Sequence, residues 1–183
     1  SNTAVGNIHL KNGDYQNARK YFSKAIERLT ENYTRPANCE PLYLQGLTLR
    51  ALGLYDEAID TLYRATWDYA YHSPAYFQLA QLSSIKGDYD KALAEVQQSL
   101  STNNRDNRAI ALKAALQRKT GKLNEALLTI QPILETDPLD FRIRNEQYLL
   151  VKNQENTLKS KEVLTSLENE MRQFDDNYLE LAV

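Results

Sequence analysis

The residues best suited to covalent chemistry in this chain are one cysteine and two histidines. Cys39, flanked by Asn38 and Glu40, is the only thiol in 183 residues, and His9 and His72 are the only imidazoles. A catalytic cysteine needs a histidine close in space to take its proton. His9 could meet Cys39 only through the fold, because no sequence motif joins them. We therefore expect a free, inert thiol.

The other titratable residues also point away from catalysis. Asp56 and Glu57 are adjacent carboxylates, but they closely follow Gly53 at the predicted start of a helix. The positive end of the helix dipole favours acidic side chains there. One cysteine and two histidines leave few soft metal ligands, and a single thiol excludes an internal disulfide framework. The sequence therefore predicts no enzyme, no metal site and no cofactor.

Composition excludes several partner classes. The chain has 22 basic and 24 acidic residues, a formal net charge of −2, and so no electrostatic footprint for a nucleic acid or a membrane surface. No apolar run approaches the roughly 18 residues of a membrane span. The first residues, Ser1-Asn2-Thr3, show no signal peptide, and we expect them to be an expression scar on a fragment. These features slightly favour a cytoplasmic location.

The elements that must position any site repeat along the chain. Gly53, Gly87 and Gly121 recur at one constant spacing, and each follows an apolar helical stretch. A further copy, Gly13, precedes Gly53 at a longer interval. Each of these glycines is followed at the same short distance by an alanine: Ala18, Ala58, Ala92 and Ala126. A constant period of about 34 residues indicates stacked helical hairpins.

A second register supports the first. At a fixed distance before each turn glycine stands a small side chain: Gly6, Gly46, Ala80 or Ala114. Paired with the alanines on the partner helix, these residues let two backbones approach closely, although each helical glycine costs about 1 kcal/mol relative to alanine. Apolar residues at three- and four-residue steps indicate a helix on either side of each turn. Each repeat is therefore predicted to be an antiparallel helix pair.

These registers resemble the tetratricopeptide repeat (TPR) family. The family pattern is matched best by Leu42, Gly46, Gly53, Tyr55, Ala58, Leu62 and Ala65. The resemblance covers residues 2–138 and implies an all-α fold, a right-handed α-solenoid of antiparallel helix pairs (the TPR superhelix). It divides the chain into four repeats at about 2–34, 40–72, 73–106 and 107–138. A degenerate fifth helix pair at 139–174 and the truncated start of a sixth repeat at 175–183 follow.

The chain departs from the repeat pattern at several places. Six additional residues within Thr30 to Pro41 predict a longer second helix in the first repeat, followed by a loop. Ser73-Pro74 predicts the start of a helix, and Pro132 should kink or break the helix that contains it. Tyr148 and Glu155 replace the small residue and the turn glycine, so the fifth pair cannot pack as closely.

The resemblance also implies a concave surface, lined by the first helix of each pair, that binds an extended or helical peptide. The residues that it places there are Asn7, Lys11, Tyr43, Leu47, Arg50, Phe77, Gln81, Ala111, Ala115, Arg118, Asn145 and Lys152. This lining suits a peptide with apolar anchors and an acidic group. The co-chaperone members of the family grip a terminal carboxylate with Lys and Asn. Here Asn7 matches, but Thr3 and Leu44 replace two of the required residues, so we expect no chaperone-tail recognition.

Each groove residue also has a plainer interpretation. Aromatic residues at helical spacing belong mostly to the core, so Tyr43 and Phe77 could simply pack between adjacent repeats. Basic residues on a helix are more often part of a solvated face than of a carboxylate clamp, and this applies to Lys11, Arg50 and Arg118.

The densest local feature is an aromatic cluster: Tyr63, Trp67, Tyr69, Tyr71, Tyr76 and Phe77. It could form a recognition surface, because Trp and Tyr dominate binding hot spots. It could equally form the seam between the second and third repeats, with hydroxyl groups reaching solvent or backbone. The seam is the better interpretation for Trp67, whereas Tyr69 and Tyr71 stay open between the two.

Two functions from different classes are consistent with these features. The first is a scaffold that captures a protein or peptide in its groove, as part of a larger protein. The second is a structural platform for a catalytic or carbohydrate-binding domain of the same chain. The second depends on a narrower resemblance: the segments 40–47, 65–67 and 137–140 are similar to the repeat region of large bacterial proteins, in which the repeats follow an uncharacterised sandwich domain thought to handle carbohydrate.

Overall fold

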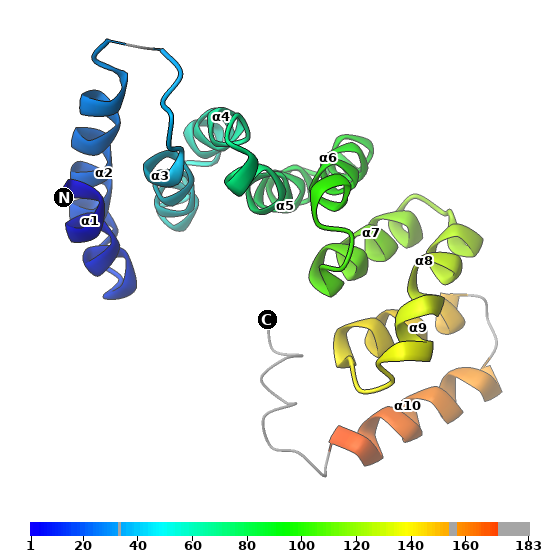
Figure 1. Ribbon diagram of the computed structural model, residues 1–183. Coiled ribbons are helices and arrows are strands. Elements are labelled where there is room, and N and C mark those ends of the chain that lie inside the picture. The colour runs from blue at the N-terminus through cyan, green and yellow to red at the C-terminus, as the bar shows by residue number, and fades with distance from the viewer. Residues whose placement is uncertain (33, 154–156, 172–183) are drawn as a thin grey trace. The chain divides into compact units, whose positions relative to one another are not determined.

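The computed structural model describes residues 1–32, 34–153 and 157–171, and these ranges contain ten helices and no strand (Figure 1). The chain divides into two compact units, Ser1–Asn104 and Arg105–Val183. Each unit is built from consecutive helix pairs.

The first unit contains three helix pairs. They are α1 (Asn2–Lys11) with α2 (Tyr15–Thr30), α3 (Glu40–Ala51) with α4 (Tyr55–Ala65), and α5 (Tyr69–Ile85) with α6 (Tyr89–Thr102). The second helix of one pair packs against the first helix of the next, α2 on α3 and α4 on α5. The first helices also contact one another, α1 with α3 and α3 with α5. They therefore lie side by side.

In its described residues, the second unit repeats this arrangement with two pairs. They are α7 (Asn107–Lys119) with α8 (Leu123–Thr136), and α9 (Phe141–Asn153) with α10 (Thr157–Met171). Here too α8 packs on α9, and the first helices α7 and α9 touch. The predicted fold class, an all-α solenoid of helix pairs, is confirmed.

The turn glycines end the first helices by a backbone conformation that other residues adopt at a cost. Gly53 has a φ of 74°, in the left-handed region where a Cβ atom is unfavourable. Its N–H donates to Arg50 O at 3.0 Å, and the next N–H, of Leu54, donates to Leu49 O at 2.9 Å. These two bonds satisfy carbonyl groups that the helix end would leave unpaired. Gly13, Gly87 and Gly121 also have positive φ values.

The small residues of the first helices make room for large side chains of the second helices, which the sequence did not reveal. A Cβ atom on Gly6 would lie 2.7 Å from Phe22 Cε1, and one on Gly46 would lie 2.5 Å from Leu62 Cγ. Phe22 and Leu62 hold equivalent positions on the second helices of their pairs and are fully buried. Large apolar side chains, rather than the predicted Ala18 and Ala58 alone, therefore fill the space that the glycines leave.

Two expected effects of proline, a helix start at Ser73-Pro74 and a helix break at Pro132, are not found. The first concerns the start of α5, which begins at Tyr69 rather than at Ser73-Pro74 and contains Pro74. Asp68 supplies the cap, since its Oδ1 accepts from Ala70 N at 3.0 Å. Tyr71, in the added turn, packs against the core of the first unit. Burial of this side chain favours the earlier start over the local preference of proline.

The second concerns Pro132, which does not break α8, since the helix continues to Thr136. Proline deprives the carbonyl of residue 128 of its helical partner, but Leu128 is 75% exposed, on the solvent side of the helix. Ile130, fully buried, holds the helix to the core of the second unit, together with Ile133 and Leu134. Such tertiary packing outweighs a local helix breaker.

The departure predicted between the first two repeats agrees with the structure in its described residues, and the looser packing of the fifth pair stays a prediction. Helix α2 has 16 residues against 11 in α4, and the segment between α2 and α3 has no regular structure in its described residues. In the fifth pair Tyr148 is half-buried, and Phe141 and Leu167 form a small core of their own. Glu155 and the predicted sixth repeat lie outside the described residues.

Within residues 1–32, 34–153 and 157–171, no helix combines the length and the hydrophobicity that a membrane span needs.

Candidate functional site

The predicted groove residues of the first unit lie on adjacent first helices. Tyr43, Leu47 and Arg50 follow one another on α3 at helical spacing, and Phe77 and Gln81 lie on α5. All five side chains are half-buried. Because α3 contacts α5, we group these five residues under one name, the α3–α5 face.

Helix α1 extends the row of first helices. Asn7, half-buried, and Lys11, exposed, lie one turn apart on α1, and α1 contacts α3. Asn7 and Lys11 therefore border the α3–α5 face.

Arg50 connects α3 to α5. Its Nη1 donates to Gln78 Oε1 and, at 2.6 Å, to Gln81 Oε1. Gln78 was not among the predicted groove residues. The guanidinium group is thus oriented by two neutral amide oxygens, one from each of two neighbouring turns of α5.

Arg118 makes the corresponding connection in the second unit, but to a carboxylate. Its Nε and Nη2 donate to Glu146 at 2.9 and 3.0 Å, and only 13% and 11% of the two side chains is exposed. Sequence reasoning missed Glu146 as well. A bidentate pair of this kind is a strong structural contact, and its partner already neutralises Arg118.

The other predicted residues of the second unit are spread over its first helices. Ala111 is buried and Ala115 half-buried on α7, whereas Asn145 is half-buried and Lys152 exposed on α9. Lys152 Nζ lies 5.8 Å from the centre of the Tyr148 ring. The structure places Asn145 and Lys152 on the same helix as Glu146.

The aromatic cluster divides into a packed part and an exposed part. Tyr63 and Tyr76 pack against the core, edge to face, with ring centres 6.3 Å apart. Tyr71 also packs there, and its ring lies tilted against that of Tyr43, with ring centres 5.5 Å apart. Trp67 is 43% exposed and Tyr69 79% exposed. The seam interpretation thus describes the packed members, while Trp67 lies largely at the surface.

Two tyrosines of this cluster have perturbed acidity. Burial, followed by the hydrogen bond that its hydroxyl donates to Glu95, raises the pKa of Tyr63 well above its usual value. Burial and then the nearby carboxylates of Glu40 and Asp68 raise the pKa of Tyr71. Both phenols are therefore neutral at physiological pH and can donate hydrogen bonds but carry no charge.

The exposed part of the cluster is held by an arginine. Arg35 Nη2 donates to Trp67 O at 2.7 Å, and its guanidinium carbon lies 5.9 Å from the centre of the Trp67 ring.

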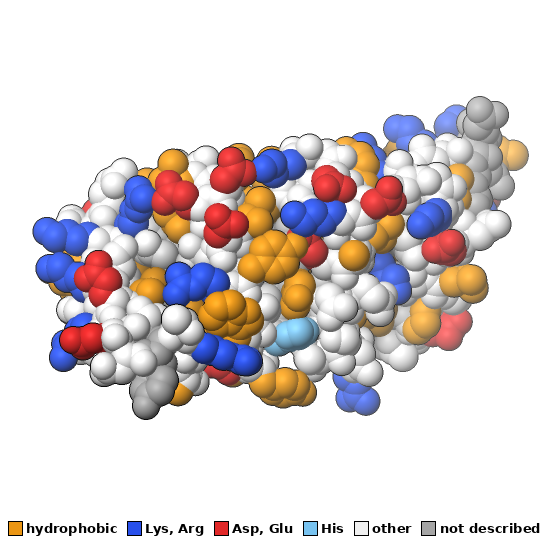
Figure 2. Space-filling view, turned by 90° about the horizontal axis from the view of Figure 1, so that it is seen from above, with side chains coloured by type: hydrophobic (Ala, Val, Ile, Leu, Met, Phe, Trp, Pro, Cys, Tyr) orange, Lys and Arg blue, Asp and Glu red, His pale blue; other side chains and the backbone are white. Residues whose placement is uncertain are grey.

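Figure 2 shows hydrophobic side chains gathered beside a histidine, and Lys and Arg interspersed with Asp and Glu over the face in view. This mixture of signs agrees with the small net charge of −2.

The candidate catalytic pair of Cys39 and His9 does not form. Cys39 is fully buried, and its thiol faces the carbonyl groups of Pro36 and Arg64. Burial, and then the charge of Asp68, raises the pKa of the thiol. His9 instead contacts Asp14 at 2.9 Å and stacks on a tyrosine ring. Cys39 therefore stays protonated and unreactive.

Metal ligation also lacks a geometric basis in the described ranges. No group of three or more His, Cys, Asp or Glu side chains there is arranged to hold a metal ion.

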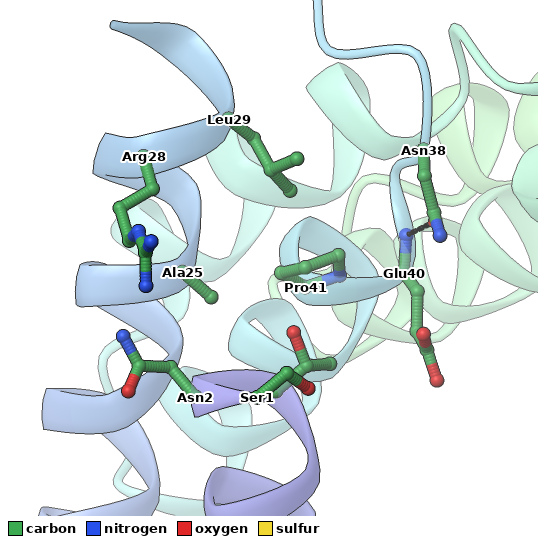
Figure 3. A pocket seen from close by; sticks show the side chains of 9 residues that line it. Ser1, Asn2, Ala25, Arg28, Leu29, Asn38, Glu40 and Pro41 are labelled. Carbon is green, nitrogen blue, oxygen red and sulfur yellow. Dashed lines mark hydrogen bonds between the residues drawn. The ribbon is translucent and has the colours of Figure 1, made fainter.

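A pocket of about 320 Å³ opens where three segments of the first unit meet (Figure 3). Arg28 and Leu29 come from α2, Asn38 from the segment before α3, and Glu40 from the first residue of α3. Ser1, which caps α1, completes this part of the lining. Asn38 Oδ1 accepts from Glu40 N at 2.8 Å. Sequence reasoning missed this pocket, although the additional residues between the first two repeats mark its wall. Its opposite charges, Arg28 and Glu40, select no ligand class.

Comparison with solved structures shows the same fold in several proteins. A tetratricopeptide repeat protein from Parabacteroides merdae superposes with a TM-score of 0.83 at 21% identity, over 94% of this chain and 66% of that chain. MamA from Desulfovibrio magneticus gives 0.80 at 20% identity, over 95% of each chain. YrrB, described as a TPR protein with an unusual peptide-binding site, gives 0.72 at 19% identity, over 99% of this chain and 89% of that chain.

Two family models match the sequence itself. Both describe the tetratricopeptide repeat, and they cover residues 1–66 and 73–106. The first match spans α1 to α4 and the second lies over α5 and α6. Together with the turn glycines, the small-residue register and the stacked helix pairs, these matches lead to one conclusion. The chain belongs to the tetratricopeptide repeat family.

Proposed function

We propose that this protein is a scaffold that binds a protein or peptide partner through the α3–α5 face and the neighbouring residues Asn7 and Lys11 of α1. The observation that carries the proposal is the half-buried set of Tyr43, Leu47, Arg50, Phe77 and Gln81 on touching first helices. Such a surface combines apolar area with fixed hydrogen-bonding groups, which is what peptide recognition requires. Arg118, Asn145 and Lys152 are the corresponding proposed positions of the second unit.

Site-directed photo-crosslinking tests this function. With p-benzoylphenylalanine at Phe77, we expect covalent products with one or a few proteins in cells, identified by mass spectrometry. The same amino acid at Gln97, an exposed position of the second helix α6, is the matched control. Because the two positions lie on different helices of one pair, specific capture should occur at Phe77 alone. Equal products at both positions would contradict binding through the α3–α5 face.

The second candidate, a platform for another domain of the same polypeptide, is favoured by an uncovered face of α1. Ile8 is 59% exposed. The register-equivalent residues Thr48, Leu82 and Leu150 are fully buried, in first helices against which the second helix of the preceding pair packs. Val5, one turn from Ile8, is also exposed. The position is buried in these later pairs, and its side chain in α1 is apolar, which suggests that a further segment covers it in α1.

For the platform we expect an intramolecular crosslink. When p-benzoylphenylalanine replaces Ile8 in the natural full-length polypeptide, the main product should join residue 8 to a peptide outside residues 1–183, with no change in the number of chains. Thr136, exposed at the end of α8, serves as the control position. Crosslinks from residue 8 to separate proteins only would rule out the platform.

A further inference from the structure

Arg50 and Arg118 occupy the same position of the repeat, two repeat lengths apart. Each lies in the last turn of a first helix, and each donates to the residue 28 positions later on the next first helix, Gln78 or Glu146. The negative end of the helix dipole acts on both arginines alike. Any difference between them must therefore come from their partners.

The partners differ in charge. Glu146 is a carboxylate that accepts two hydrogen bonds from Arg118 and neutralises it. Gln78 and Gln81 are amides, so they accept hydrogen bonds from Arg50 without removing its charge. In the described part of the chain Arg50 forms no ion pair, and only its Nη1 is used in hydrogen bonds. Its Nε and Nη2 donors are thus left for solvent or a ligand.

The two amides also fix where the charge is. Arg50 Nη1 donates to both Gln78 and Gln81, three residues apart on α5. The guanidinium group of this α3 residue is therefore held against α5. A half-buried arginine held in this way loses less conformational entropy when it binds a carboxylate. Arg118 is oriented too, but its bidentate site is already occupied.

Apolar contact area lies at a defined distance from Arg50. Leu47 lies one turn before it on α3, and Tyr43, whose ring is tilted against that of Tyr71, lies two turns before it. Two turns correspond to about 10 Å along a helix. An extended peptide covers this distance in about three residues.

We propose that Arg50 is the carboxylate-binding residue of the α3–α5 face, and that its partner is an acidic peptide. This inference rests on the proposed function and adds the chemistry of the partner to it. The peptide carries one Asp, Glu or terminal carboxylate at Arg50 and an apolar side chain about three extended residues away, against Leu47 and Tyr43. Arg118 does not bind a carboxylate of the partner, because Glu146 already accepts its hydrogen bonds.

The chain itself suggests the variant that tests this. Gln78→Glu reproduces at Arg50 the partner that Arg118 already has, so it should fold and should neutralise Arg50. The matched control is Gln97→Glu, the same chemical change at an exposed position of α6. A phage-displayed library of random dodecamer peptides is selected on the wild-type chain, and selected peptides are synthesised for fluorescence anisotropy.

We expect the selected peptides to be enriched in acidic residues and to bind more weakly as salt is raised. Gln78→Glu should weaken them about tenfold or more, the effect of losing a hydrogen bond between charged groups, whereas Gln97→Glu should not. If Gln78→Glu does not give the wild-type circular dichroism spectrum, Arg50→Gln replaces it in the same comparison. It removes the charge without adding another.

The possible failures are distinguishable. Peptides that bind the wild type without acidic enrichment, or that bind Gln78→Glu equally well, would overturn the role of Arg50 and leave the proposed function standing. A library that yields no binding peptide at all would count against both.

Discussion

Replacing Arg118 by alanine is expected to lower the free energy of unfolding of the second unit by about 3–5 kcal/mol. Glu146 accepts both of its hydrogen bonds from Arg118, and only 11% of its side chain is exposed. Removal of the arginine leaves this carboxylate without a partner in a position where water cannot fully solvate it. The cost arises from the stranded charge more than from the lost contact.

Urea denaturation measures this loss, and hydrogen exchange of α7 and α9 localises it. Arg50→Ala is the matched control, because it removes the register-equivalent arginine but strands only the neutral amides of Gln78 and Gln81. Its cost should be about 1 kcal/mol. The double variant Arg118→Met/Glu146→Leu should recover most of the loss, since an apolar pair can replace a buried ion pair. A similar, small cost for Arg118→Ala and Arg50→Ala would show that Glu146 is hydrated.

Gly46→Ala is expected to destabilise the first unit by about 1–3 kcal/mol, against the usual helix preference for alanine. Alanine gains about 1 kcal/mol in helix propensity. The new Cβ atom, however, would lie 2.5 Å from Leu62 Cγ, and Leu62 is fully buried in a close-packed interior with little space to move into. Overpacking therefore outweighs propensity at this position.

A double variant separates the two effects. Gly46→Ala/Leu62→Val copies the combination of Ala80 and Val96, which occupy the same positions of the next pair and are both fully buried. We expect it to be more stable than Gly46→Ala alone in thermal and urea unfolding, although valine is smaller than leucine. Leu62→Val is measured alone as well. If the stability losses of Gly46→Ala and Leu62→Val simply add up in the double variant, the two residues do not share one packing space.

Elements of the fold that depend on local chemistry were predictable from the sequence. The turns at Gly53, Gly87 and Gly121 were correctly placed, because a positive φ selects glycine wherever a first helix must end. The helix pairs followed from apolar side chains at three- and four-residue steps. Such features depend on a few consecutive residues, and a constant repeat period presents them often enough to be recognised.

The helix start expected at Pro74 and the helix break expected at Pro132 are both absent for a common reason. At Pro74 and Pro132 the local preference opposes helix, but each helix is held by side chains that pack on distant residues. Tyr71 contacts the core of the first unit, and Ile130 that of the second. Tertiary burial exceeded a cost of about 3 kcal/mol for proline inside a helix, and no local window of sequence contains that burial.

The helices that carry the proposed site were predictable from the sequence, but the charge partners of its arginines were not. The positions of Tyr43, Leu47 and Arg50 on one helix follow from their spacing, and the contact of α3 with α5 adds Phe77 and Gln81. From their repeat positions, Arg50 and Arg118 were predicted to be equivalent basic residues of the groove. Only the structure shows that Arg118 is neutralised by Glu146 and that Arg50 is held by two amides.

The sequence by itself therefore determined the family, the helix pairs and the turn that ends each first helix, because backbone sterics and side-chain periodicity act over short stretches. The tertiary structure decided which side chain meets which across neighbouring helices. It placed Phe22 and Leu62 against glycines, packed Tyr71 against the core, and gave Arg50 and Arg118 partners of different charge. The physical reason is that burial and charge pairing depend on residues far apart in the sequence, whose identity is free to vary from one repeat to the next.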